Sequence, residues 1–200
     1  MKLETNNKAL CLKSLRRVGL VFVILLAASP RALAEPQINE KREFYDIRGG
    51  SESELKNEMN TKGINDGRMN DAYTKWYVRW DFDYGSGAPC RFRAVRVSAD
   101  IDIKLPRWQN ERDGSDELRQ KWDRFLKALE EHENGHRDFG VKAATEIDAE
   151  LSRMPAFPNC TELGAAANAK AYEILGKYQG EEKAYDAETN HGINKGAVFP

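Results

Sequence analysis

The sequence predicts an α+β domain in which an antiparallel sheet flanks one long helix, with a second helix near the C-terminus. Two observations support this fold class. Residues 76–105 alternate apolar and polar side chains with a period of two, which is typical of half-buried strands. Residues 115–153 instead repeat apolar side chains every three or four positions, which is typical of a helix with one buried face.

The first 34 residues have the pattern of a secretory signal peptide and are left out of the predicted fold. A basic segment ending at Arg17 is followed by an apolar run over residues 18–28 and by the small residues Ala32 and Ala34. This run is too short to span a bilayer as a stable helix, so we expect cleavage rather than a retained membrane anchor. Residues 35–200 would then form a single domain that is secreted or periplasmic.

The charge of the chain argues against two classes of partner. Removal of the leader takes away six of the 31 basic residues and one of the 32 acidic ones, which leaves a net charge of −6. An acidic protein is repelled by the phosphates of nucleic acid and by anionic lipid. We therefore expect no nucleic-acid partner and no stable membrane attachment after cleavage.

Two cysteines remain after the leader and predict a disulfide bond. Cys11 lies in the leader, so the mature chain holds only Cys90 and Cys160, an even number in an exported protein. Closing a loop of about 70 residues contributes roughly 4 kcal/mol in the chain-entropy model. The alternative, that both are zinc ligands, is weaker because neither has a neighbouring residue of the ligand type.

The elements begin with a short strand and a short helix. Residues 42–47 alternate apolar and polar side chains, which predicts the first strand. Ser51 can cap a helix that runs to about Asn60, with Glu54 in the position of a capping box. Gly63 is expected to end this helix.

A long antiparallel hairpin follows. The first strand covers residues 76–84, the turn residues 85–89 and the second strand residues 90–105. The apolar positions of the second strand shift by one residue near Ala94, which predicts a β-bulge there.

The long helix is expected to begin at Ser115, which can act as its N-cap. Its 39 residues exceed the usual helix length, so we expect a break or bend, for which Gly140 is the candidate. Pro155 and Pro158 should terminate it.

The second helix is expected after Cys160. Thr161 can cap it, the pattern continues to about Tyr178, and Gly180 should close it. Residues 181–200 have no periodicity and read as a tail.

Two of the three histidines of the chain lie in one motif inside the long helix. His132, Glu133 and His136 form the pattern H-E-x-x-H, which places both imidazoles on the same helix face, where they can hold one metal ion. Gly135 would let another segment approach the helix closely. The alternative is a pair of core histidines with Glu133 on the solvated side. Two imidazoles on a buried face are costly without a shared partner, which favours Zn²⁺.

The third ligand is open between three residues of the C-terminal region. His191 is favoured because imidazole suits zinc and because Gly192 lets the chain turn toward the site. Glu173 and Asp186 are the alternatives. A zinc ion with three protein ligands would carry a water molecule whose pKa is lowered to roughly 7. Glu133 could take a proton from that water as the general base.

A donor is also needed for the negative charge that develops on the attacked carbonyl oxygen. Tyr185 is the candidate for this catalytic role because it lies near His191 in the sequence. A packing role for Tyr185 is the alternative.

Two segments carry a resemblance to a known family. The runs FLKALEEHENGHRDFG and YDAETNHGINKGAVFP resemble a bacterial family of predicted secreted zinc-dependent proteases that bears a domain-of-unknown-function label. The likeness covers essentially the whole mature chain, and the pattern Y-D-x-x-T-x-H-G is its more distinctive part. The resemblance implies a zincin-like fold and implies that His191 belongs to the site beside His132, Glu133 and His136.

These observations together predict an exported zinc metallopeptidase that acts on a peptide or protein substrate. An edge strand of the sheet could pair with an extended substrate. Two other functions remain open: a non-catalytic, zinc-stabilised binding module of the cell envelope, and an amidase that cleaves cell-wall peptides.

Overall fold

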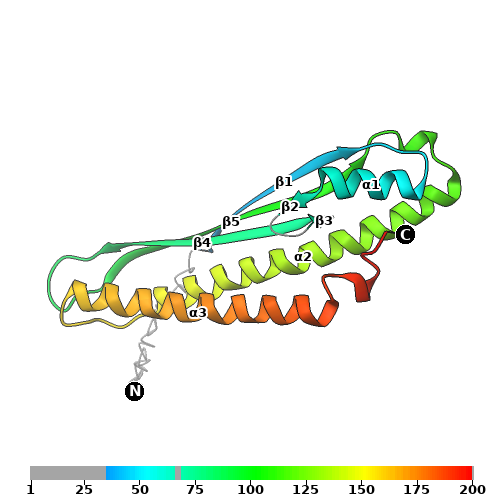
Figure 1. Ribbon diagram of the computed structural model, residues 1–200. Helices are drawn as coiled ribbons and strands as arrows, with labels where there is room; N and C mark the ends of the chain where they lie inside the picture. Colours follow the sequence, from blue (N-terminus) through cyan, green and yellow to red (C-terminus); the bar gives the residue numbers. More distant parts are fainter. Residues whose placement is uncertain (1–34, 66–68, 200) are drawn as a thin grey trace, which may run out of the picture. The chain divides into compact units, whose positions relative to one another are not determined.

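The computed structural model describes residues 35–65 and 69–199, so the signal peptide predicted over residues 1–34 lies outside the described residues (Figure 1). Among the described residues, no helix has both the length and the apolar character needed to cross a membrane. The elements, in chain order, are β1 (Gln37–Ile47), α1 (Glu52–Lys62), β2 (Ile64–Asn65), β3 (Met69–Asn70), β4 (Tyr73–Tyr84), β5 (Phe92–Trp108), η1 (Glu111–Asp113), α2 (Asp116–Ser152), α3 (Cys160–Thr189) and η2 (Ile193–Lys195).

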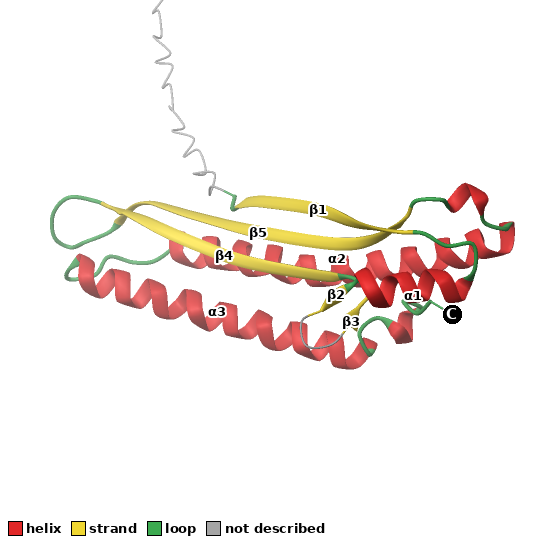
Figure 2. Cartoon of the chain, turned by 45° about the horizontal axis from the view of Figure 1, so that its top comes forward, coloured by secondary structure: helices red, strands yellow, loops and turns green. Residues whose placement is uncertain are grey.

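The predicted α+β class is confirmed, and the elements form two layers. A three-stranded sheet in the order β1-β5-β4 lies over the helices α2 and α3, which run beside each other (Figures 1 and 2). The buried side chains of β5 point at α2 and alternate along the strand, as at Val97, Ala99 and Ile101. The hydrophobic core therefore lies between the sheet and α2.

The predicted hairpin and its bulge are confirmed. Strands β4 and β5 pair in antiparallel orientation from Tyr73 opposite Lys104 onward. The register shifts near the hairpin end, because Asp83 pairs with Ala94 while the next residue of β4 pairs with Phe92. The additional residue in β5 changes which side chains face the core, as the phase shift in the sequence indicated.

Strand β1 corrects the prediction of a purely antiparallel sheet. It pairs with β5 in parallel orientation, from Gln37 opposite Ser98 to Ile47 opposite Trp108. Parallel neighbours require a crossover connection. The chain makes this crossover through α1 before it enters β4, so β1 and β4 occupy opposite edges of the sheet.

Helix α1 forms as predicted. The hydroxyl of Ser51 accepts a hydrogen bond from the backbone amide of Glu54, and Gly63 follows the last helical residue. The Glu54 carboxylate accepts from the amide of Gly50 at 2.7 Å, one residue before the cap. Leu55 and Met59 are buried and fix the helix against the end of β1.

Helix α2 begins after the predicted cap, Ser115, and runs through 37 residues without the expected break. Gly140 serves close packing instead. A Cβ atom at this position would lie 2.8 Å from both Cβ and Cγ of Trp76, so the missing side chain lets β4 approach the helix. The continuous helix holds both motif histidines on one rigid element.

Helix α3 is longer than predicted, and both of its expected ends are wrong. Asn159 rather than Thr161 is the N-cap, with its side chain accepting from the amide of Glu162 at 2.9 Å. The helix passes through Gly180 and ends at Thr189. An interior glycine costs about 1 kcal/mol relative to alanine. Packing of α3 on α2, with Tyr178 and Thr189 buried, offsets this cost.

The predicted disulfide between Cys90 and Cys160 is confirmed. It ties the segment just before β5 to the first residue of α3. Two backbone hydrogen bonds between Cys90 and Phe157, of 2.8 and 2.9 Å, support the same junction.

The residues that follow α3 fold back onto the first half of α2. The ring of Phe199 packs against Trp122 and Phe125, with centroid separations of 5.6 and 5.2 Å. This contact anchors the end of the chain beside the motif-bearing helix.

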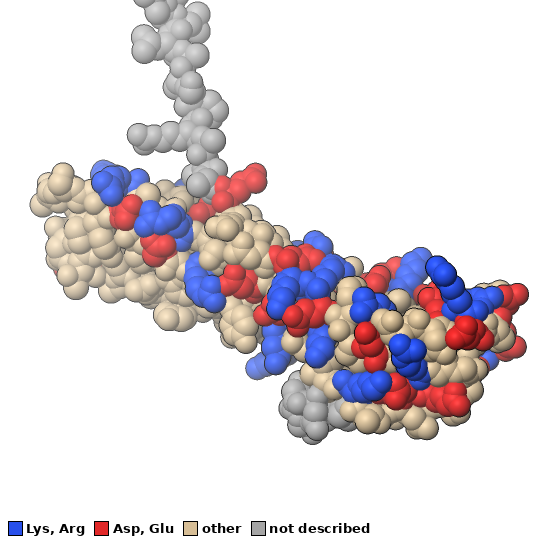
Figure 3. All heavy atoms as spheres, turned by 90° about the horizontal axis from the view of Figure 1, so that it is seen from above, with Lys and Arg blue, Asp and Glu red and all other residues tan. Residues whose placement is uncertain are grey.

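The outer face of the sheet carries charges of both signs. Arg79 of β4 pairs with Asp100 of β5, and Arg96 of β5 pairs with Asp81 and Asp83 of β4. Figure 3 shows basic and acidic side chains intermixed over this side of the molecule. Neighbouring opposite charges largely cancel there, so this face presents no patch of a single sign.

Candidate metal centre

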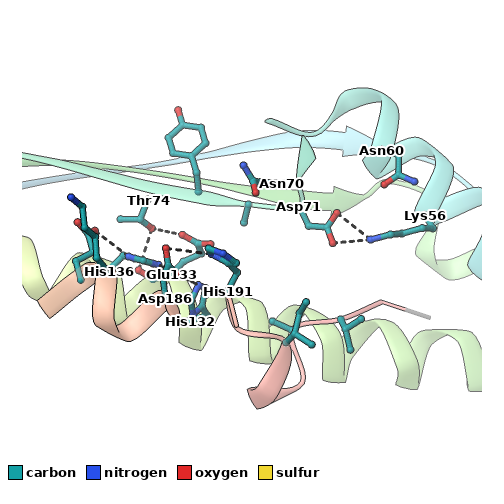
Figure 4. A pocket seen from close by; sticks show the side chains of 17 residues that line it. Lys56, Asn60, Asn70, Asp71, Thr74, His132, Glu133, His136, Asp186 and His191 are labelled. Carbon is teal, nitrogen blue, oxygen red and sulfur yellow. Dashed lines mark hydrogen bonds and ion pairs between the residues drawn. The ribbon is translucent and has the colours of Figure 1, made fainter. Parts of the chain in front are cut away.

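Three side chains from α2 and α3 converge on one point. The Nε2 atoms of His132 and His136 lie 3.2 Å apart. The Oδ1 atom of Asp186 lies 3.3 Å from the first of them and 3.1 Å from the second. Both histidines are buried, and the Asp186 side chain is 30% exposed. Figure 4 shows these three side chains close together.

This triangle has the dimensions of a zinc site. Ligands held at about 2.0 Å from a tetrahedral zinc ion are separated from one another by about 3.3 Å. The three separations, 3.1 to 3.3 Å, match that value and are nearly equal. Two imidazole nitrogens and one carboxylate oxygen are also donors that zinc prefers. Geometry and donor chemistry therefore both fit one divalent cation at this position.

A carboxylate of α3 orients His136. The Nδ1 atom of His136 lies 3.0 Å from Oε1 of Glu182, and the same oxygen accepts a hydrogen bond of 2.9 Å from the indole of Trp76. A proton on Nδ1 satisfies this contact and leaves the lone pair on Nε2, which faces the triangle. Such a carboxylate behind a ligating histidine is typical of metal sites.

Packing contacts also hold the ring of His132 in place. The ring of Tyr185 stacks on it, with centroids 5.1 Å apart and planes 16° from parallel. Gly192 lies against the imidazole, where a Cβ atom would be 2.9 Å from Cγ of His132. Nδ1 of His132 has no hydrogen-bond partner among the described residues. Burial, together with the charge of His136, lowers the pKa of His132 to about 4, so this imidazole is neutral at physiological pH.

Glu133 lies in the same pocket and is 4% exposed. Thr74, at the start of β4, donates a hydrogen bond of 2.7 Å to Oε2 of this carboxylate. Burial raises the pKa of Glu133 to about 7, although the Thr74 hydrogen bond acts in the opposite direction. The group is therefore poised to gain or lose a proton near neutral pH.

The three candidates for the third ligand lie at different distances from the two motif histidines. Asp186 supplies the third donor of the triangle. His191 lies just outside it, with Nδ1 3.4 Å from the second oxygen of Asp186, and its side chain is 43% exposed. Glu173 is bonded to Lys170 at 2.8 Å on α3, and its 13-residue separation from Asp186 corresponds to about 20 Å along the helix.

Tyr185 is placed behind the site. Its hydroxyl donates a 3.4 Å hydrogen bond to the backbone carbonyl of His132. It also occupies the space above Gly135, where a Cβ atom would lie 2.5 Å from the hydroxyl oxygen. The close approach expected at Gly135 is therefore made by the side chain of Tyr185. From this position the Tyr185 ring can pack against His132.

A pocket of about 440 Å³ opens in front of the triangle. Its walls come from the start of β4 and the segment before it, from α1, from α2 and α3, and from the C-terminal residues. The lining residues are Lys56, Asn60, Asn70, Asp71, Ala72, Tyr73, Thr74, His132, Glu133, His136, Glu182, Lys183, Asp186, His191, Ile193, Ala197 and Val198.

The sequence profile of a bacterial protein family of unknown function, DUF922, matches residues 42–192. The chain belongs to the DUF922 family. Every side chain of the triangle lies within the matched region, together with Glu133 and His191. No curated protein and no solved structure matches the chain. The description of DUF922 assigns no activity, so membership supports the extent of the domain rather than its chemistry.

Three supporting residues in the DUF922 region were not identified from the sequence. Thr74 and Trp76 belong to the strand that covers α2, and only the sheet brings them to the motif. Glu182 is one helical turn before Asp186, so recognition of a helix through Gly180 would have placed both carboxylates on one face.

Proposed function

We propose that this DUF922 protein is an exported metallopeptidase of the zincin-like type. His132, His136 and Asp186 hold one divalent ion, for which Zn²⁺ is the best match, and Glu133 is the general base. The observation that carries the proposal is the triangle of nearly equal donor separations beside a buried carboxylate in an open pocket.

A bound Zn²⁺ supplies a Lewis acid that polarises a carbonyl and makes a coordinated water more acidic. The protein residues account for the proton transfers. A pKa of about 7 lets Glu133 take a proton from water and then pass it to the departing amine. Thr74 holds one oxygen of this carboxylate and leaves the other for the reacting water.

The position of β4 supports a peptide substrate. This strand is at an edge of the sheet, and within the described part of the chain it pairs only with β5. Its first residues, Tyr73 and Thr74, line the pocket. An extended peptide that pairs with this edge would be held by backbone hydrogen bonds and would pass in front of Glu133.

The open pocket favours catalysis over a purely structural ion. Structural zinc sites are normally closed by four protein ligands, whereas catalytic sites keep one position free. Here three donors face a pocket of about 440 Å³. A non-catalytic module would also gain nothing from burying Glu133 beside the ligands.

The first test is metal content and its dependence on the motif. Purified protein should contain close to one zinc per chain by mass spectrometry of the metal. His132→Ala and His136→Ala should each abolish binding, because either change removes one of three donors. Full occupancy in both variants would end the proposal.

The second test separates binding from catalysis. Glu133→Gln should keep the metal and lose hydrolysis, while Glu131→Gln, an exposed neighbour on the same helix, should keep both. Unchanged turnover in Glu133→Gln would remove this residue from its role. Parallel incubation with casein-type substrates and with peptidoglycan decides between a general protease and a cell-wall amidase. A protein that holds zinc but cleaves neither would be a binding module.

The third test identifies the remaining ligand. Asp186→Ala should lose zinc, whereas His191→Ala should retain it, because Asp186 supplies a donor of the triangle while Nδ1 of His191 lies 3.4 Å from the other oxygen of that carboxylate. The opposite result would make His191 the ligand.

A further inference from the structure

Asp148 is a buried carboxylate that the proposed hydrolysis does not use. It lies in the second half of α2 and is 4% exposed. In the part of the chain that the structure describes, no hydrogen bond or ion pair reaches it, and burial alone raises its pKa. The Asp148 side chain lines a pocket, and a cation bound in that pocket would offset the cost of burying its charge.

A pocket of about 490 Å³ adjoins Asp148 where β1 begins. Strand β1 starts at Gln37 opposite Ser98, so no strand of the described part of the chain pairs with residues 92–97 of β5 on that side. The pocket lies where β1 begins and the edge of β5 becomes uncovered by the described strands. Its lining residues are Glu35, Gln37, Arg79, Trp80, Asp81, Val95, Arg96, Val97, Ser98 and Asp148.

The two basic side chains of this pocket are already paired elsewhere. Arg79 bonds Asp100, and Arg96 bonds Asp81 and Asp83. These are pairs between neighbouring strands on the outer face of the sheet, whereas Asp148 comes from the helix beneath it. Neither arginine therefore neutralises the carboxylate.

Cleavage of the predicted signal peptide would create a cation close to Asp148. Hydrolysis of the bond between Ala34 and Glu35 by water, at the expected cleavage site, leaves a free α-amino group on Glu35. Such a group has an ordinary pKa of about 7.7–8.0 and is mostly protonated at neutral pH. Glu35 lines the same pocket as Asp148.

We propose that the pocket beside Asp148 receives the α-ammonium group of the mature N-terminus. Removal of the signal peptide then completes an ion pair between the start of β1 and helix α2. The pair adds a constraint to the edge of the sheet that exists only after processing. This inference does not depend on the metal centre, and the two can fail separately.

The test compares chains that begin at Glu35 with a free or an acetylated amino group, since the core residues found in the described part of the chain lie between Tyr45 and Phe199. Acetylation should lower the urea midpoint of the chain with Asp148 and leave that of Asp148→Asn unchanged. Asp148→Asn should lower the midpoint of the free form but not of the acetylated form, in which it removes an unpaired charge. Asp123 is an exposed carboxylate of the same helix. Asp123→Asn should leave the effect of acetylation on the urea midpoint unchanged.

A second readout follows the amino group itself. Pairing with Asp148 should raise its pKa, and one unit reduces the reactive, unprotonated fraction about tenfold. Acylation of the N-terminus at neutral pH should therefore be about tenfold slower than in Asp148→Asn. Equal effects of acetylation with and without Asp148 would overturn the proposal. A second result would also overturn it: acetylation leaves the urea midpoint unchanged, and added methylammonium raises the midpoint of the acetylated chain. The cation in the pocket would then be a separate ligand and not the N-terminus.

Discussion

Gly140→Ala is the change that tests most directly how the sheet supports the metal centre. The added Cβ would lie 2.8 Å from Cβ and Cγ of Trp76, atoms too close to the backbone to move freely. The indole of Trp76 donates to Glu182, and Glu182 contacts Nδ1 of His136. Displacement of Trp76 should therefore reach a ligand of the proposed metal.

The expected size combines two opposing terms. Alanine inside a helix gains about 1 kcal/mol over glycine. Overpacking of a core contact costs about 1–3 kcal/mol. Gly140→Ala should then lower the free energy of unfolding by up to about 2 kcal/mol, whereas Gly180→Ala, with open space around it, should raise it by about 1 kcal/mol. Loss of the support behind His136 should weaken zinc binding by about 10–100-fold.

The assay is urea unfolding of both metal-free variants, followed by competitive zinc titration. The control, Gly180→Ala, lies in the interior of α3 and should leave zinc affinity unchanged. Equal stabilisation by the two substitutions would refute the close approach of Trp76 to α2. Reduced stability of Gly140→Ala with unchanged zinc affinity would refute the link through Glu182.

Three further predictions concern the site and the disulfide. Glu182→Gln should weaken zinc binding by about 10–100-fold in a competitive titration, while Glu181→Gln should not, because Glu182, unlike its exposed neighbour, contacts Nδ1 of His136. Burial lowers the pKa of His136, but the Glu182 hydrogen bond and nearby carboxylates outweigh it and raise that pKa above its ordinary value of about 6.5. A protonated His136 cannot bind metal, so zinc affinity should fall as the pH drops through this raised pKa, and an affinity that stays constant down to about pH 5 would contradict the assignment. Replacement of both Cys90 and Cys160 by serine opens a loop of 70 residues and should lower the free energy of unfolding by about 4 kcal/mol, measured with urea; a loss below about 1 kcal/mol would contradict the loop-closure argument.

Several features of the fold were predictable because they depend on neighbours in the sequence. The caps at Ser51 and Ser115 depend on residues three positions away, and the structure contains both. The bulge near Ala94 followed from a phase shift within a single strand. Glycine was a weaker guide, because neither Gly140 nor Gly180 ends or breaks its helix. Packing against another element can offset a local propensity of about 1 kcal/mol.

The third donor shows the limit of sequence reasoning most clearly. Residues 181–200 lack a clear apolar period, so the sequence predicts a tail that includes Asp186 and favours His191 on donor chemistry. The structure extends α3 through Glu182 and Asp186, and its packing on α2 brings Asp186 to the motif. Fifty residues separate Asp186 from His136, and no local pattern specifies that contact.

The amino-acid sequence by itself determined that His132 and His136 share a helix face with Glu133 beside them, since a helical turn relates residues four apart whatever surrounds them. It also indicated the pairing of the two remaining cysteines. Only the tertiary structure decided the parallel placement of β1, the position of Asp186 beside His132 and His136, and the burial that raises the pKa of Glu133 to about 7. These properties arise from contacts between distant segments, and their energies exist only after the sheet and both helices have packed together.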